Sequence, residues 1–148
     1  MIKIAILGFG SRGQMFAEHA VKNKNVKIVA IADPAEACKK KAENYLPPCA
    51  IYNTADEFFA KGKICDAVLI CSQDADHKDM ALKALNLGYD ILLEKPAACT
   101  LEDCVAIRDE ANRLNRKVML THVLRYAPAF QYIKKLIIDG KLGKIVNI

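Results

Sequence analysis

Tryptophan is absent from this chain of 148 residues, and glycine and proline are sparse, at seven and five residues. This composition excludes collagen-like chains and low-complexity disordered chains, which are rich in glycine and proline. The apolar share of 53% and the charged share of 26% are those of an ordinary globular domain. A chain of this length buries enough surface to fold without disulfide or metal support.

Long apolar runs and paired cysteines are missing as well. The early apolar run, residues 4–7, is too short for a signal sequence or a membrane span, so we expect no membrane partner. The six cysteines form no CxxC pair, and buried reduced thiols in a cytoplasmic protein are the simplest interpretation. The histidines lack companions at metal-ligand spacing, so we predict no metal site.

Positive charge is in modest excess, with 22 basic and 17 acidic residues and a net charge of +5. The basic clusters, at residues 39–41 and 134–144, contain no interleaved aromatic side chains that could stack on bases. We therefore expect no nucleic-acid partner. The cluster at residues 39–41 is interpreted as the solvated face of a helix.

Short apolar runs alternate with amphipathic segments along most of the chain. Strands are predicted at residues 2–7, 26–32, 50–52, 66–71, 90–93 and 117–121. Helices are predicted at residues 14–22, 35–45, 55–61, 75–87 and 101–114, two of them with capping boxes that begin at Thr54 and Thr100. Because several runs are almost continuously apolar, the pattern predicts an α/β protein whose parallel sheet is covered by helices on both faces.

The alternation changes near Val123. A further helix is predicted at residues 129–139 and a final strand at residues 144–148. We therefore predict a first domain at residues 1–122 and the opening of a second α/β domain at residues 123–148. Because the last predicted strand has no following element to cover it, we expect the chain to be a truncated part of a longer protein.

The segment Gly8-Phe9-Gly10-Ser11-Arg12-Gly13 follows the first predicted strand and opens the first helix. In a dinucleotide site, the first glycine permits a tight turn and the second lets the backbone approach a pyrophosphate. The third lets helix and strand pack closely. The helix N-terminus adds unpaired N–H groups and positive potential. The position of this motif predicts a dinucleotide-binding loop.

Asp33 ends the second predicted strand, about 20 residues beyond Gly13, where a dinucleotide site places its acidic residue. A carboxylate there can accept both ribose hydroxyls of the adenosine and repels a 2′-phosphate. Pro34 follows where an NADP site often has an arginine. We therefore predict NAD as the cofactor and NADP as less favoured, although Arg12 could soften that preference. The alternative is that Asp33 caps the next helix.

Glu94-Lys95-Pro96 follows the fifth predicted strand, at the sheet edge where α/β proteins bind ligands. Pro96 restricts the backbone of Lys95. A lysine beside a bound cofactor can hydrogen-bond a substrate hydroxyl and stabilise the alkoxide as hydride leaves. We interpret Lys95 as the catalytic residue, and the alternative is an ordinary surface turn.

With these motifs, the chain resembles the N-terminal part of the Gfo/Idh/MocA family of NAD(P)-dependent oxidoreductases over essentially its whole length. The matching segments are the three glycines, Asp33, residues 71–77, Glu94-Lys95-Pro96 and Arg125-Tyr126-Ala127-Pro128. The resemblance implies a Rossmann-type doubly wound parallel sheet, followed by the first helix and strand of a second domain. It also implies hydride transfer between nicotinamide and a carbinol or carbonyl carbon of a sugar, polyol or related small molecule.

The resemblance assigns site residues as well. Lys95 takes the place of the active-site lysine, and a cis peptide is expected before Pro96. The residues expected to bind the cofactor are Gly8, Phe9, Gly10, Ser11, Arg12, Gly13, Asp33, Cys71, Ser72, Gln73, His77, Glu94 and Lys95.

One loop departs from the family pattern. The family usually has Thr-Pro-Asn before the loop histidine, where this chain has Ser72-Gln73-Asp74. Ser72 can still donate to the cofactor, whereas Gln73 removes a rigid turn. We expect His77 in the first turn of the next helix, near the nicotinamide, with a purely structural histidine as the alternative. We interpret His122, near the same site, as structural, with contact to the substrate as the alternative, and His19 as solvent-facing.

Family enzymes carry a catalytic histidine, often with an aspartate, on the second domain, beyond residue 148. The resemblance therefore implies that this chain alone binds cofactor without turnover, and that the full-length parent is a homo-oligomer. Two other function classes stay open. A non-catalytic nucleotide-sensing module shares the glycine motif but does not explain Glu94-Lys95-Pro96 or the Arg125 segment. An S-adenosylmethionine methyltransferase shares the glycine-rich turn but predicts no lysine after the fifth strand.

Overall fold

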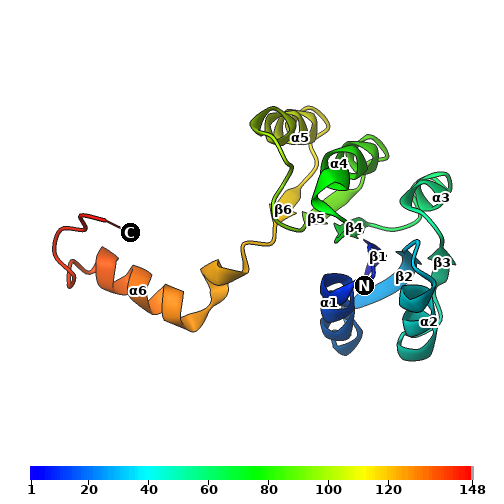
Figure 1. Ribbon diagram of the computed structural model, residues 1–148, viewed down its shortest axis with the longest axis horizontal. Coiled ribbons are helices and arrows are strands. Elements are labelled where there is room, and N and C mark those ends of the chain that lie inside the picture. Colours follow the sequence, from blue (N-terminus) through cyan, green and yellow to red (C-terminus); the bar gives the residue numbers. More distant parts are fainter. Residues whose placement is uncertain (148) are drawn as a thin grey trace.

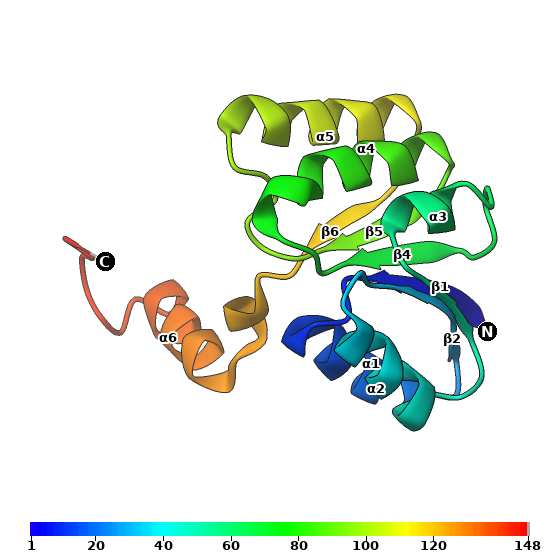
Figure 2. The same cartoon turned by 45° about the vertical axis from the view of Figure 1, so that its right-hand side comes forward.

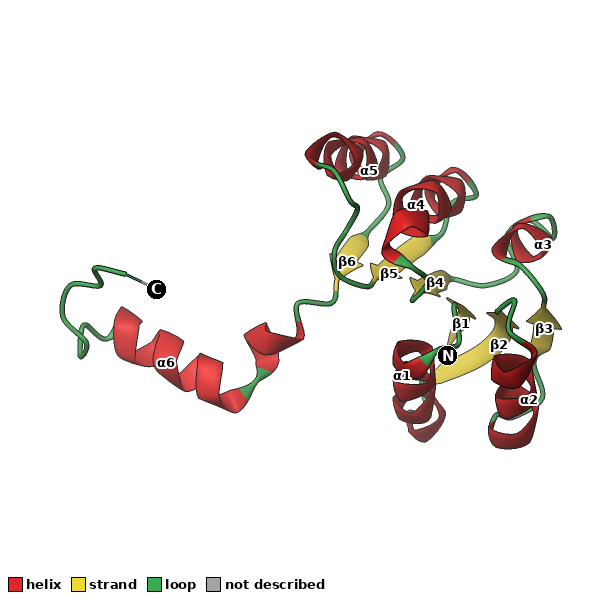
Figure 3. Ribbon diagram, in the orientation of Figure 1, coloured by secondary structure: helices red, strands yellow, loops and turns green. Residues whose placement is uncertain are grey.

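The computed structural model describes residues 1–147 and contains one parallel sheet of six strands. The strands are β1 (Ile2–Leu7), β2 (Val26–Ala32), β3 (Ala50–Tyr52), β4 (Ala67–Ile70), β5 (Asp90–Leu93) and β6 (Val118–Leu120). Their spatial order is β3-β2-β1-β4-β5-β6, and every adjacent pair is parallel (Figures 1 and 3). This is the order of a doubly wound Rossmann sheet, as predicted.

Helices cover both faces of the sheet. They are α1 (Ser11–Lys22), α2 (Glu36–Tyr45), α3 (Ala55–Phe59), α4 (His77–Asn86), α5 (Leu101–Arg113) and α6 (Pro128–Ile138), with short 3-10 helices η1 (Asp74–Asp76) and η2 (Val123–Tyr126). Figure 2 shows α1 and α2 on one face and α3, α4 and α5 on the other. The strands are therefore buried from both sides, which explains their almost continuous apolar sequences.

The two predicted helix caps are present. The side-chain oxygens of Thr54 and Thr100 accept the backbone N–H groups of Glu57 and Asp103, each at 3.1 Å. Glu57 reaches back to the backbone N–H of Asn53 rather than to that of Thr54, at 2.9 Å. These local bonds fix where α3 and α5 begin.

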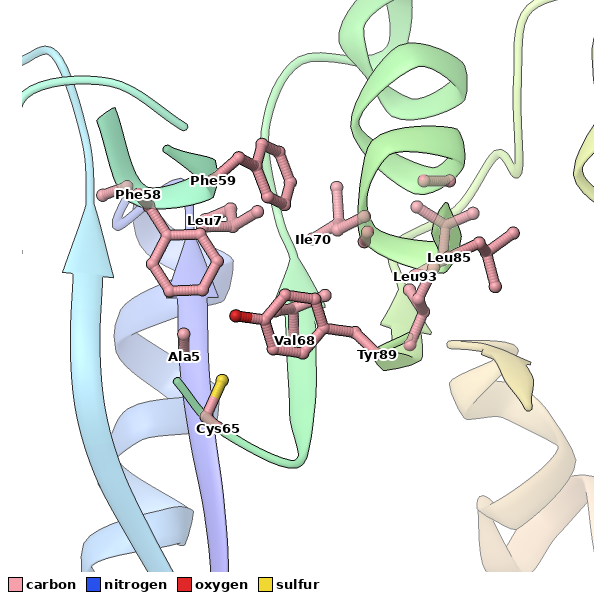
Figure 4. Close-up of a cluster of buried hydrophobic side chains, with 14 of the residues drawn as sticks. Ala5, Leu7, Phe58, Phe59, Cys65, Val68, Ile70, Leu85, Tyr89 and Leu93 are labelled. Atoms are coloured by element: carbon pink, nitrogen blue, oxygen red, sulfur yellow. The ribbon is translucent and has the colours of Figure 1, made fainter. Parts of the chain in front are cut away.

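The larger part of the core lies between the sheet and α3, α4 and α5 (Figure 4). Phe58 and Tyr89 stack with ring centroids 5.8 Å apart, and both are fully buried. The Tyr89 hydroxyl donates to the Gly62 carbonyl oxygen at 2.7 Å and accepts from Ile64 N–H at 3.0 Å. The only polar atom of this large side chain is therefore satisfied, so its burial stabilises the fold.

The segment after β6 does not pack on the sheet as the other helices do. In Figure 1, α6 projects away from the sheet, and its apolar side chains Phe130, Ile133 and Ile137 are exposed. The prediction of a strand at residues 144–148 is wrong for residues 144–147, which have no strand conformation, while Ile148 lies outside the described residues. A strand needs a neighbour for its backbone groups, and no other strand lies beside this run in residues 1–147. Whether a second domain begins at residue 123 stays a prediction.

Within residues 1–147, no helix has both the length and the apolar character needed to cross a membrane. All six cysteines are unpaired. The expectation that they are mostly buried is only partly correct, because Cys65 alone is fully buried and Cys99 is exposed. Cys99 lies in the loop that leaves β5, whose carboxyl end faces the site described next.

Candidate functional site

The glycine loop connects β1 to α1 at the point where the strand order reverses between β1 and β4. Gly8 has a φ of +89°, and a Cβ there would overlap the Cys71 carbonyl group after β4. A Cβ on Gly13 would overlap the Gly8 carbonyl oxygen. Around Gly10, by contrast, no described atom lies within 4 Å of an added Cβ.

The close backbone contacts at Gly8 and Gly13 agree with the steric roles that the sequence predicts, and the role of Gly10 beside a pyrophosphate stays a prediction. Gly8 and Gly13 allow backbone segments to touch, and Gly10 leaves open space beside the N-terminus of α1. A phosphate group fits such a place, because the first amides of a helix have no internal partners and carry positive potential. The loop therefore fits the pyrophosphate of a dinucleotide, although binding by its residues stays a prediction.

Asp33 follows β2 and is 6% exposed. Its Oδ2 accepts the backbone N–H of Phe9 at 2.6 Å, and its Oδ1 accepts that of Ala35 at 2.8 Å. The alternative that Asp33 caps α2 is wrong, because the N-cap residue is Ala35. A carboxylate oxygen has more than one acceptor position, so ribose hydroxyls can still bind there. Asp33 therefore also tethers the glycine loop, which the sequence did not predict.

A cavity of about 410 Å³, here called the cofactor cleft, joins the glycine loop to Asp33. It is lined by Gly8, Gly10, Asp33, Ser72, Gln73 and Met80, among others. The Ser72 hydroxyl is buried and has no hydrogen-bond partner within residues 1–147, so it is available to a ligand. Met80, on α4, forms an apolar part of the cleft wall. The sequence did not predict this role, because Met80 occupies a position like any other core position of an amphipathic helix.

The cofactor cleft also contains Cys71. Burial, with a smaller contribution from the negative charge of Glu94, raises the pKa of the Cys71 thiol to about 12. The thiol is therefore neutral at physiological pH and acts as a small apolar group in the wall of the cleft.

The Glu94-Lys95-Pro96 loop leaves β5 at the same edge of the sheet. Glu94 is 5% exposed, and its Oε2 accepts the backbone N–H of Lys95 at 3.0 Å. Its Oε1 has no hydrogen-bond partner among the described residues, and Arg12 Nε lies 3.9 Å away. The Lys95–Pro96 peptide is cis, as the resemblance implies. Lys95 itself is exposed.

His77 is the first residue of α4 and is completely buried. Its Nδ1 lies 2.7 Å from the Pro96 carbonyl oxygen. Because a carbonyl oxygen can only accept, Nδ1 carries the hydrogen in this bond. Nε2 is buried and has no partner in the described part of the chain. The position in the first turn of the helix is as predicted, and His77 holds the loop that carries Lys95.

A second cavity, of about 460 Å³, opens beside Lys95 and is here called the lysine cleft. It is lined by Arg12, Lys95, Thr121, His122, Arg125 and two apolar residues. Thr121 is 7% exposed, and its hydroxyl has no partner within residues 1–147. The sequence did not single out Thr121, because a threonine at a strand end has no pattern that distinguishes it from a packing residue.

Arg12 lies in the lysine cleft and not in the cofactor cleft. The side chains that line the cofactor cleft include no lysine or arginine from the described residues. The expectation that Arg12 could soften a preference for NAD therefore has no geometric support. The acidic cleft fits a ribose diol better than a 2′-phosphate.

No three histidine, cysteine, aspartate or glutamate side chains in residues 1–147 gather in a way that could hold a metal ion. The glycine loop contributes to both clefts, through Gly10 on one side and Arg12 on the other.

Comparison with protein families gives a match over residues 2–122, to the family described as oxidoreductases with an NAD-binding Rossmann fold. Among curated relatives, 2,7-anhydro-N-acetylneuraminate hydratase of Escherichia coli is 26% identical over 99% of this chain. Glucose-6-phosphate 3-dehydrogenase of Bacillus subtilis is 29% identical over the whole chain.

Among solved structures, the scyllo-inositol dehydrogenase of Lactobacillus casei with bound NAD(H) and scyllo-inositol has a TM-score of 0.89. It is 28% identical and covers 98% of this chain. The chain spans 38% and 41% of the two curated relatives and 43% of the solved structure.

Proposed function

Because the family match covers most of its length, the chain belongs to the Gfo/Idh/MocA oxidoreductase family with an NAD-binding Rossmann fold, and we propose that it serves a dehydrogenase of sugars or polyols. Hydride moves between the nicotinamide and a carbinol or carbonyl carbon of the substrate. Relatives named for a sugar phosphate and an inositol support this substrate class. The observation that carries the proposal is the placement of Lys95 and the glycine loop on one edge of the sheet.

Cofactor binding is divided among a few groups of this chain. The glycine loop and the N-terminus of α1 receive the pyrophosphate, and Asp33 accepts the ribose hydroxyls. Ser72, whose hydroxyl is unpartnered in the cofactor cleft, donates to the cofactor. We expect NAD(H) to bind better than NADP(H), because a 2′-phosphate would face the Asp33 carboxylate in a cleft whose described lining contains no lysine or arginine.

Lys95 orients the reacting substrate oxygen and stabilises negative charge on it. The bound nicotinamide supplies the hydride donor or acceptor. Lys95 is held from two sides, by its backbone bond to Glu94 and by the bond between His77 and Pro96. Such support matters because an ammonium must be positioned where the charge develops.

The proton of the substrate hydroxyl needs a base that these residues do not offer. His77 is buried and occupied with Pro96. His122 lines the lysine cleft, but within residues 1–147 no carboxylate is hydrogen-bonded to its ring. We therefore propose that this chain alone is inactive and that a longer, cytoplasmic and oligomeric parent completes the site.

The second candidate is a non-catalytic module that binds NAD(H) for regulation. It is favoured by the absence of a histidine–carboxylate pair in the described part of the lysine cleft. The family match removes the methyltransferase alternative. Catalysis is the better proposal, because a regulatory nucleotide site does not require an exposed amine at the end of β5.

Isothermal titration of the chain with NADH and NADPH tests cofactor binding, with S-adenosylmethionine as the negative control. We expect heat from NADH, weaker binding of NADPH and none from the control. Lys95→Ala in the full-length parent then separates catalysis from sensing. We expect the variant to lose turnover by about a hundredfold or more while keeping its NADH affinity. Equal losses of both would reassign Lys95 to cofactor binding.

A further inference from the structure

The lysine cleft carries an unbalanced positive charge. Its lining includes the three cations Arg12, Lys95 and Arg125, and no acidic side chain of the described residues lines it. The buried Glu94 carboxylate lies 3.9 Å from Arg12 Nε. Arg12 is thus partly neutralised, whereas the other two cations are not. A cleft with this charge favours an anionic ligand over a neutral one.

Arg125 is held by its backbone and left free at its side chain. Its N–H donates to the His122 carbonyl oxygen at 3.0 Å, and its own carbonyl oxygen accepts from Gln131 Nε2 at 3.4 Å. No described residue makes a hydrogen bond or ion pair with its guanidinium group. An arginine in this state is ready to bind a carboxylate or phosphate through two parallel N–H donors.

Thr121 gives an independent indication of a ligand. It is more than nine-tenths buried, lines the same cleft, and its hydroxyl has no partner within residues 1–147. An unpaired buried hydroxyl is unfavourable unless a ligand or water satisfies it. The hydroxyl can donate one hydrogen bond to an anion.

The pyrophosphate of the cofactor does not account for these two residues. Its pyrophosphate has the glycine loop after β1 and the N-terminus of α1. Thr121 and Arg125 follow β6, which is separated from β1 in the sheet by β4 and β5. Arg12, on α1 itself, is the cation that the pyrophosphate can share.

We propose that the substrate is a sugar or polyol that carries a carboxylate or phosphate group, bound by Arg125 and Thr121 while Lys95 meets the reacting hydroxyl. This inference rests on the proposed function, since it adds an anion-binding subsite to the same cleft. It separates two substrate classes that the fold does not distinguish, the neutral polyols and the acidic ones.

The test uses three ligands with the same carbon chain: D-glucitol, D-gluconate and D-glucitol 6-phosphate. Each is titrated into the ¹⁵N-labelled chain, with and without saturating NADH, and amide shifts of Thr121 and Arg125 are followed. We expect at least one anionic ligand to bind about tenfold more tightly than D-glucitol, because a charge-assisted bond contributes about 1.5–3 kcal/mol. The stronger of the two anions identifies carboxylate or phosphate.

Arg125→Gln is the test variant, and Arg108→Gln is its matched control. Arg108 pairs with Asp109 on the exposed surface of α5 and does not line the lysine cleft, so the control loses the same charge outside the proposed subsite. We expect Arg125→Gln to abolish the tenfold preference and Arg108→Gln to keep it. Arg125→Lys should retain part of the preference, because it keeps the charge but not the fork of donors.

Three results overturn the inference: D-glucitol binding as tightly as both anions, none of the three ligands binding, or Arg125→Gln keeping the preference. Failure of NADH to bind overturns the proposed function instead. The two failures are distinguishable, because the same titrations are run on the chain without NADH.

Discussion

The two clefts at the edge of the sheet are built in opposite ways. In the cofactor cleft, the acidic group is already bound by the chain, since both oxygens of Asp33 accept backbone N–H groups. In the lysine cleft, the guanidinium of Arg125 and the hydroxyl of Thr121 have no partner in residues 1–147. The carboxylate of the first cleft is held in place by the fold, although the Ser72 hydroxyl there is unpartnered. In the second cleft, the buried Thr121 hydroxyl needs a ligand or a water molecule, and the exposed Arg125 side chain is free to bind a ligand.

This difference predicts which substitutions lower the stability of the fold and which lower ligand binding alone. Substitution of Asp33, which the fold holds in the cofactor cleft, should lower stability and cofactor affinity together. Substitutions in the lysine cleft should leave stability unchanged or raise it, while ligand binding falls. Natural proteins commonly carry such unfavourable groups at functional sites.

The largest expected effect is a difference in reactivity between the Cys71 thiol in the cofactor cleft and the exposed Cys99 thiol. Burial raises the pKa of the Cys71 thiol in the cofactor cleft from 9.0 to about 12. At pH 8 its thiolate fraction is about a thousandfold lower than that of an unperturbed thiol, since each pKa unit is a factor of ten. We expect iodoacetamide to modify exposed Cys99 first and to leave Cys71 unmodified in the folded chain, as peptide mass spectrometry would show. Rapid modification of Cys71 would mean that the cofactor cleft is not preorganised.

The same thiol has a consequence for alkaline stability. Its folded-state pKa lies above the unfolded value, so its protonated form contributes stability that is fully present below pH 9. This contribution is lost as the pH rises from 9 towards 12. We expect the free energy of unfolding, measured by urea denaturation at several pH values, to decline less between pH 9 and 12 in Cys71→Ala than in the parent chain.

Gly13→Ala is the next largest change. The added Cβ would overlap the Gly8 carbonyl oxygen, and backbone atoms cannot move aside cheaply. We expect the free energy of unfolding to fall by about 3 kcal/mol, at the upper end of overpacking costs. The matched control is Gly10→Ala, whose Cβ meets no described atom within 4 Å. It should leave stability within about 0.5 kcal/mol of the parent chain and weaken NADH binding instead.

Asp33→Ala should affect both properties of the cofactor cleft. The buried Phe9 N–H loses its acceptor, which costs about 1–3 kcal/mol of stability. NADH affinity should fall about tenfold and the advantage of NADH over NADPH should narrow, as measured by titration calorimetry. Unchanged discrimination between the two cofactors would leave Asp33 with a structural role alone.

Thr121→Val is expected to have the smallest effect, and it should raise the free energy of unfolding, whereas the two preceding substitutions lower it. Valine has a similar shape and removes the unpaired hydroxyl, so the free energy of unfolding should rise by about 1 kcal/mol. Thermal denaturation measures this change. A loss of stability would show that the hydroxyl is satisfied in solution, and the contrast between the clefts would then be smaller than described.

The sequence was sufficient for the six strands, the helices between them and the glycine loop. Continuous apolar runs report burial on both faces, and the steric roles of Gly8 and Gly13 follow from their positions after a strand. The strand at residues 144–147 was predicted wrongly, because apolar character favours a strand only where a partner strand is available.

Sequence reasoning was weaker for long-range contacts within the site. The bond between Asp33 and Phe9 joins residues that lie on different connections of the sheet. Thr121 becomes notable only through the absence of a partner, which no pattern of residues reveals. The position of Arg12 beside Lys95 depends on which way the first turn of α1 faces, and the motif leaves that open.

The hydrogen bond from His77 to Pro96 spans the two clefts. The residues just before His77 line the cofactor cleft, and Pro96 immediately follows Lys95. A single imidazole ring therefore links the loop before α4 to the loop after β5 that carries Lys95. We expect that loss of this ring, as in His77→Ala, leaves the loop that carries Lys95 without one of its two supports.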